Sequence, residues 1–235
     1  MISSTFLTRI IFKIIKPFIF VIILIASSCN RTIHYRENAS DELTTEEMQT
    51  LNAGDVILRQ GFGVISEAIA TFSKDKYPVS HCGLIVQNQD GSFSVIHTVS
   101  NALSETDGMQ KDSLSVFVRD AKKNTIIILR HHLLKNDDVL VEKLTQQAEL
   151  YLQRQIPFDN QFDFDDTTAF FCTEMIWHLF DNALHTNIFS VGKKQYHSMQ
   201  FSAFFDTNTF VPIVNHFENN SLDENRRDST AIQRK

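Results

Sequence analysis

The sequence predicts an α+β domain in which helices pack against a small antiparallel sheet. Amphipathic stretches with helical spacing alternate with short runs rich in β-branched residues, and a tight turn joins two of these runs. A chain of 235 residues with 43% hydrophobic residues can bury one good core, and no internal repeat is visible. We therefore expect one main domain, from residue 44 to residue 218.

The amino terminus has the composition of a signal peptide. Residues 1–28 contain three basic residues and no acidic one, and their apolar run covers residues 18–26. Signal peptides have apolar runs of about 7–15 residues, whereas about 20 are needed to span a bilayer. Small residues directly before Cys29 resemble a bacterial lipoprotein cleavage site, so Cys29 is expected to become the lipidated first residue. A plain signal peptide and an uncleaved anchor are the alternatives.

Processing at Cys29 would leave an acidic, membrane-anchored protein of the cell envelope, facing the periplasm or the exterior. Removal of three positive charges takes the formal net charge from −6 to −9, which excludes nucleic-acid phosphates as expected partners. Residues 29–43 are expected to form a polar tether and residues 219–235 a disordered polar tail. The sequence does not indicate the oligomeric state.

The first half of the expected domain contains a short helix, a strand, a second helix and paired strands. Thr44 and Glu47 form a capping-box signature for the short helix. A strand is then expected from Gly54 to Arg59, and a helix at residues 62–72. Further strand patterns lie at residues 80–86, 92–99, 114–118 and 125–129, with a turn at residues 89–91.

The second half contains two amphipathic helices separated by an Asp-rich loop. The first helix is expected at residues 137–155 and the second begins near Cys172. The loop suggests calcium, but its aspartates lack the EF-hand spacing, the glycine turn and the distal glutamate: Asp159, Asp163, Asp165 and Asp166. His131 and His132 are adjacent on a strand and would point to opposite faces. We infer no metal and no other cofactor.

Phenylalanine is concentrated in the last third of the chain. Of the 20 phenylalanines, 12 lie from residue 158 onward, and most are expected to be core residues. A cluster with little regular pattern could instead roof an apolar groove beside Cys172: Phe201, Phe204, Phe205 and Phe210.

Two distant segments carry the candidate chemistry. His81 begins a β-branched apolar run, and Cys172 begins a helical pattern and lies on its apolar stripe. The unpaired N–H groups and dipole at a helix start favour a thiolate, so Cys172 has the position of a nucleophile. Each residue alone also fits a structural role, because a single cysteine on an apolar face is usually a small core residue.

The order of these segments resembles a known family. From residue 52 to about residue 217 the chain is similar to the permuted NlpC/P60 group of papain-like enzymes, the YaeF/YiiX type. The matching pieces are Ala53–Arg59 (AGDVILR), Ser80–Val86 (SHCGLIV), Pro157–Asp159 (PFD) with Phe162–Asp163, and Phe171–Glu174 (FCTE). The histidine strand precedes the cysteine helix, as circular permutation of a papain-like core would produce.

The resemblance implies three catalytic residues. Cys172 would be the nucleophile, His81 its base, and His97 the orienting residue on the next strand. A carboxylate is commoner at the position of His97, so a plain strand histidine is the alternative there. A disulfide between Cys82 and Cys172 is a further alternative in an exported protein. We expect no such bond, because alternation should turn Cys82 away from the face that His81 offers to the cysteine helix.

These observations predict an exported, lipid-anchored cysteine hydrolase, an amidase or peptidase that cleaves a peptide-type amide of the cell envelope. A lipid esterase or acyltransferase of the same fold is the second enzyme hypothesis. A non-catalytic module that binds peptide or lipid is the alternative outside catalysis. A hydrolase needs a Cys172 thiol with a low pKa that reacts with alkylating reagents, whereas a binding module does not. The reactivity of this thiol would therefore distinguish the two hypotheses.

Overall fold

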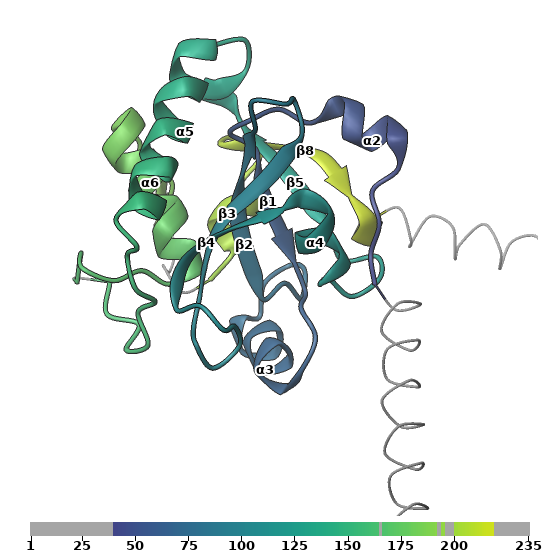
Figure 1. Ribbon diagram of the computed structural model, residues 1–235. Coiled ribbons are helices and arrows are strands. Elements are labelled where there is room, and N and C mark those ends of the chain that lie inside the picture. The colour runs from purple at the N-terminus through teal and green to yellow at the C-terminus, as the bar shows by residue number, and fades with distance from the viewer. Residues whose placement is uncertain (1–39, 165, 192–193, 196–199, 219–235) are drawn as a thin grey trace, which may run out of the picture. The chain divides into compact units, whose positions relative to one another are not determined.

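The computed structural model describes residues 40–164, 166–191, 194–195 and 200–218 (Figure 1). The chain divides into two units, residues 1–40 and 41–235, and the fold described below is that of the second. The predicted signal peptide, the lipidation of Cys29 and the predicted tail lie outside the described residues. Among the residues described, no helix is both long and apolar enough to cross a membrane.

An antiparallel sheet forms the centre of this unit. In the described chain it has six strands in the order β4-β3-β2-β1-β5-β8. The strands are β1 (Val56–Arg59), β2 (His81–Gln87), β3 (Phe93–Val99), β4 (Gly108–Ser113), β5 (Ile127–His131) and β8 (Phe210–Asn215). The predicted α+β class with a small antiparallel sheet is confirmed.

Helices cover both faces of the sheet. They are α2 (Thr45–Thr50), α3 (Val64–Ser73), α4 (Leu114–Arg119), α5 (Asp138–Gln153) and α6 (Cys172–Leu184), with short 3-10 turns η1 (His132–Leu134) and η2 (Ser202–Phe205). A separate two-stranded ribbon pairs β6 (Ser190–Val191) with β7 (Lys194–Gln195). Figure 1 shows α5 and α6 side by side on one face of the sheet and α4 on the other.

Strand alternation divides the core between these two faces. In β1, Val56 and Leu58 belong to the large cluster under α5 and α6, whereas Ile57 between them belongs to the small cluster under α4. In β2, Leu84 packs in the large cluster and Ile85 in the small one. Adjacent residues of the central strands therefore lie in different cores.

The predicted strand at residues 114–118 is wrong. These residues form helix α4, and the strand precedes it at Gly108–Ser113 as β4. The side chain of Ser113 accepts a hydrogen bond from the main-chain N–H of Val116 and caps the helix. Leu114 and Phe117 are then buried one turn apart on the same helix face. The apolar residues of this segment, which resemble the alternation of a strand, form the buried stripe of a helix.

Two other apolar patterns have outcomes that the sequence did not predict. The stripe of α3 points outward, with Val64 and Phe72 exposed to 86% and 79%. Phe201, Phe204 and Phe210 are each only 1% exposed and pack in the large core. These phenylalanines therefore do not roof a groove, and the last of them begins the edge strand β8, for which the sequence showed no regular pattern.

Candidate active site

The sulfur of Cys172 lies at the start of α6, where the helix meets the sheet. Cys172 is the first helical residue, and Phe171 before it has extended backbone angles. The carboxylate of Glu174 accepts a hydrogen bond of 3.1 Å from the N–H of Phe171, which ties down the entry to the helix. Cys172 is partly exposed and Glu174 is fully buried. The thiol thus sits at the first residue of a helix, and that residue is partly exposed.

A loop anchored to β3 holds this helix start in place. The buried carboxylate of Asp159 accepts hydrogen bonds from two main-chain N–H groups of its own loop, at 2.7 and 2.6 Å. The N–H of Phe170 donates to the carbonyl of Pro157 at 3.0 Å, and the hydroxyl of Thr98 donates to the carbonyl of Phe170 at 3.2 Å. Asp159 therefore organises the loop, and Asp165 lies outside the described residues.

The immediate neighbour of the Cys172 thiol is the thiol of Cys82 on β2. Contact with the Cys82 thiol lowers the pKa of Cys172, burial opposes this, and the N–H groups of Cys82, Thr173 and Cys172 itself lower it further. Burial raises the pKa of Cys82 well above its usual value, because this side chain is completely enclosed. Of these two thiols, Cys172 is the one that ionises first.

The expected orientation of Cys82 is wrong. Cys82 points toward the cysteine helix, in the large core under α6, and both cysteines are free thiols. The side chain of His81 points to the other face, toward α4. The alternation was predicted correctly, but it is the even-numbered residues of β2 that face α6.

His81 and His97 are hydrogen-bonded to each other, and the chain continues to a carboxylate. The Nε2 atom of His81 lies 2.9 Å from Nδ1 of His97, and Nε2 of His97 lies 3.1 Å from a carboxylate oxygen of Asp112. His97 is only 2% exposed, whereas the side chain of Asp112 is 38% exposed. Three neighbouring strands, β2, β3 and β4, therefore contribute one residue each to a continuous polar chain.

Phe117 of α4 and Arg59 of β1 enclose the two imidazoles. The Phe117 ring stacks on His81 with a centroid distance of 5.7 Å and meets His97 edge-on at 5.2 Å. Burial lowers the pKa of His81 well below its usual value, and the charges of His97 and Arg59 add to this. Burial also lowers the pKa of His97, although Asp112 acts in the opposite direction. Both imidazoles are therefore neutral at neutral pH.

Gly83 permits the close approach of these strands. A Cβ atom at this position would lie 2.4 Å from a methyl carbon of Val95 and 3.1 Å from the Cβ of His97. Any larger residue would push β3 away from β2 and lengthen the hydrogen bond between the two histidines. The glycine two residues after His81 thus has a steric role in the site.

The structure does not join His81 to Cys172 by a hydrogen bond. The imidazole lies at the start of β2 on the α4 side, and the thiol lies there on the α6 side. The sulfur is nevertheless near the main chain beside His81, because the N–H of the peptide that links His81 to Cys82 stabilises the thiolate. The β2–β3 ladder ends at the pair Leu84–Ile96, which leaves this N–H outside the ladder.

Sequence analysis missed Asp112. Its strand was not recognised, so its carboxylate had no predicted position. In β4, Asp112 pairs with Val95 of β3, two residues from His97 and on the same face. Recognising Gly108–Ser113 as a strand paired with β3 would have placed a carboxylate beside the candidate third residue.

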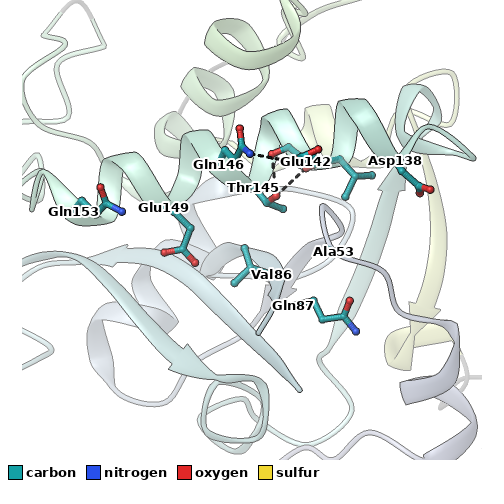
Figure 2. Close-up of a pocket in the computed structure, with 10 residues that line it drawn as sticks. Ala53, Val86, Gln87, Asp138, Glu142, Thr145, Gln146, Glu149 and Gln153 are labelled. Carbon is teal, nitrogen blue, oxygen red and sulfur yellow. Dashed lines mark hydrogen bonds between the residues drawn. The ribbon is translucent and has the colours of Figure 1, made fainter. Parts of the chain in front are cut away.

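The described surface also has a groove elsewhere, along α5. Figure 2 shows the side chains that line it, most of which come from α5 and from the end of β2 at Val86 and Gln87. Its volume is about 440 Å³. Its polar side chains include Glu142, Gln146 and Glu149, and neither a cysteine nor a histidine lines it. Gln146 donates to Glu142 at 2.9 Å, and Glu149 pairs with Lys111 at 2.7 Å. The groove contains no nucleophile and is separate from the candidate active site.

Comparison with known proteins identifies similar chains. A family model described as permuted papain-like amidase enzyme, YaeF/YiiX, C92 family, matches residues 50–221. A crystal structure titled metalloprotein yiiX from Escherichia coli O157:H7 is similar in fold, with a TM-score of 0.56 and 18% identity over 71% of this chain and 98% of that chain. Within the described residues of this chain, no group of three or more His, Cys, Asp or Glu side chains could hold a metal. No curated protein matches.

Proposed function

Because the chain belongs to the permuted papain-like amidase family of the YaeF/YiiX type, we propose that it is a cysteine hydrolase that cleaves an amide bond. The observation that carries this proposal is the arrangement at the start of β2. There the lower-pKa thiol, Cys172, lies beside the peptide that follows His81, and the ring of His81 is held by His97. A nucleophile and an oriented base are the two parts that this chemistry needs.

In this mechanism Nδ1 of His81 accepts the thiol proton. Nε2 is already bonded to His97, and Nδ1 is the ring nitrogen nearer the main chain. The sulfur lies beside the adjacent main-chain N–H. Catalytic hydrogen bonds are often long without substrate and shorten in the substrate complex. Contact between the two groups requires the imidazole to move from the α4 side of the sheet toward the α6 side.

The thiolate of Cys172 then attacks the substrate carbonyl, and a tetrahedral oxyanion forms. The N–H groups of Cys82 and Cys172 lie at the sulfur and can donate hydrogen bonds to that oxyanion. The imidazolium of His81 returns its proton to the departing amine as the C–N bond breaks. Water next hydrolyses the thioester, with His81 again as the base, and regenerates the free thiol.

The substrate that we place first is a peptide-type amide of the cell envelope. The signal-peptide composition and the cysteine at residue 29 support an exported, lipid-anchored chain at that location. Mass spectrometry of the mature protein should find an acylated Cys29 as its first residue. An intact Met1, or cleavage elsewhere, would reject lipidation and leave a signal anchor, without bearing on the hydrolase.

An acyl lipid is the second candidate substrate, because the entry to the cysteine helix is aromatic. Phe162 is 43% exposed, and its ring contacts those of Phe158 and Phe171 at centroid distances of 6.1 and 5.5 Å. Phe171 directly precedes the nucleophile. Phe171 is buried at 3% exposure, so the exposed part of this aromatic cluster is the ring of Phe162, which suits an acyl chain better than a polar peptide.

The test compares the full-length protein in detergent with two cysteine variants. Wild type is expected to release amine products from peptidoglycan fragments, and Cys172→Ala is expected to reduce turnover by about 10³-fold or more. Cys82→Ala keeps the nucleophile and should retain turnover. The increase of turnover with pH should move to higher pH in this variant, because the Cys172 thiolate loses its largest stabilising contact. Mass spectrometry detects the products.

Three outcomes would change the proposal. Cysteine-dependent release of fatty acid from phospholipid vesicles, with peptidoglycan fragments intact, would reverse the order of the two substrates. Equal loss of activity in both variants would assign the two cysteines a joint structural role. Binding of either substrate without turnover in wild type would favour the non-catalytic module.

A further inference from the structure

A carboxylate ends the chain of hydrogen bonds that begins at His81. Asp112 bonds Nε2 of His97 at 3.1 Å, and Nδ1 of the same ring lies 2.9 Å from Nε2 of His81. Each of the two contacts needs one proton, because a hydrogen bond requires a donor and an acceptor. The positions of these protons follow from the charges of the three groups.

The charge states of Asp112, His97 and His81 allow only one arrangement of the protons in the two hydrogen bonds. The hydrogen bond from His97 lowers the pKa of Asp112, so the carboxylate is ionised and accepts at neutral pH. His97 is neutral and carries a single ring proton, which therefore lies on Nε2. Nδ1 of His97 is then an acceptor, so the proton of the contact with His81 lies on Nε2 of His81. Nδ1 of His81 remains without a proton.

We propose that Asp112 is a positioning residue that sets the tautomers of His97 and His81 and leaves Nδ1 of His81 as the free base. Its role in the reaction rests on the proposed function, in which that nitrogen accepts the proton of Cys172. Asp112 itself bonds His97 and acts on His81 only through that ring. When His81 becomes an imidazolium, the carboxylate also stabilises the positive charge through the intervening His97.

The other charged groups around the chain are consistent with this role. Arg59 of β1 lies over the Phe117 ring at 4.1 Å and opposes protonation of both imidazoles. Asp120, after the end of α4, favours the protonated form of His97, but more weakly than Asp112 does. Burial has the largest effect on both rings, so neither gains a second proton at neutral pH and the position of the single proton decides which nitrogen is basic.

Nitrogen-15 NMR of the histidine rings tests the tautomers directly. In wild type, His97 and His81 should both show a protonated Nε2 and an unprotonated Nδ1, with assignments from His81→Gln and His97→Gln. Asp112→Asn presents an amide that can donate to His97, and it should move protons to the Nδ1 atoms. Asp112→Ala removes the acceptor of the His97 Nε2 proton, so this proton should no longer be protected from exchange with water. A proton on Nδ1 of His81 in wild type would overturn the proposal without any variant.

Kinetics test the role in the reaction. Asp112→Asn is expected to reduce kcat by about 10²-fold, with KM nearly unchanged and the rise of the pH–rate profile displaced, and Asp112→Glu should recover part of the loss. Glu149→Gln is the matched control, because its carboxylate is also 38% exposed and pairs with β4 but contacts no histidine. It should behave as wild type.

The two proposals fail in different ways. If wild type hydrolyses nothing, the proposed function fails, while the NMR tautomers still test Asp112. If wild type is active but Asp112→Asn and Asp112→Ala keep its ring nitrogen shifts and its pH profile, Asp112 has no positioning role. Loss of kcat with unchanged tautomers would also contradict the proposed mechanism of Asp112.

Discussion

The two faces of the central sheet differ in what they hold. The face under α5 and α6 carries the large apolar core and the two thiols, Cys82 and Cys172. The face under α4 carries the small core and the polar chain from His81 to Asp112. Cys82, whose thiol contacts that of Cys172, directly follows His81 on β2, so the proposed nucleophile and the proposed base lie on different faces beside the same strand. The proposed site is therefore at the start of β2.

The largest expected effect distinguishes the two cores. Phe180 of α6 is completely buried and packs on His131 and Phe210, so Phe180→Ala should lower the free energy of unfolding by about 3–5 kcal/mol. The ring shifts of His81 should not change. Urea unfolding and histidine NMR measure the two quantities.

Two controls accompany this variant. Phe117→Ala, on the α4 face, should destabilise to a similar degree and also raise the pKa of His81, because water would reach its ring. Phe72→Ala should change stability by less than about 0.5 kcal/mol, since this side chain is 79% exposed. A change in the NMR shifts of the His81 ring in the Phe180→Ala variant would show that the two faces of the sheet are not independent.

The next largest expected effect is a pH dependence of the free energy of unfolding, which arises from His131 on the α6 face. His131 is buried against Phe180, and burial lowers its pKa to about 4 from a usual value of 6.5. Between these values the unfolded chain binds a proton that the folded chain does not, so stability should fall as pH drops from 6.5 to 4. The loss is about 3 kcal/mol for this single group.

The His131→Asn variant isolates the contribution of His131 to the loss of stability at low pH. The asparagine amide can still accept the hydrogen bond from the N–H of Leu133, which His131 accepts at 3.1 Å, but it does not titrate in this range. Urea unfolding at pH 7, 5.5 and 4 should therefore show a smaller acid loss in the variant than in wild type. Parallel curves would mean that His131 is protonated in the folded state.

The smallest of the three effects concerns the thiols on one face. Iodoacetamide at pH 6.5 should label Cys172 at least about tenfold faster than Cys82, because contacts at the helix start lower one pKa and burial raises the other. Peptide mapping by mass spectrometry gives the two rates. Equal rates, or a Cys82–Cys172 disulfide on a non-reducing gel, would contradict the assignment of Cys172 as the reactive thiol.

Much of the fold could be read from local patterns. The Thr44–Glu47 capping box was predicted and is present, with both hydrogen bonds formed at 2.8 and 3.1 Å. The resemblance to the YaeF/YiiX type is also confirmed by the family match over residues 50–221. The failure at residues 114–118 has a local cause as well, since alternating apolar residues over five positions fit both a strand and a short helix. Only the cap at Ser113 distinguishes them.

Local patterns were sufficient to predict the class of fold, the family, and the opposite orientation of His81 and Cys82, because strand geometry and helix periodicity are properties of consecutive residues. Packing between distant segments settles which of these two residues faces α6. It also decided that Asp112 meets His97, since the side of a sheet that a helix covers and the register between strands depend on residues far apart in the chain. Local pattern gives the alternation, and packing assigns each face its partner.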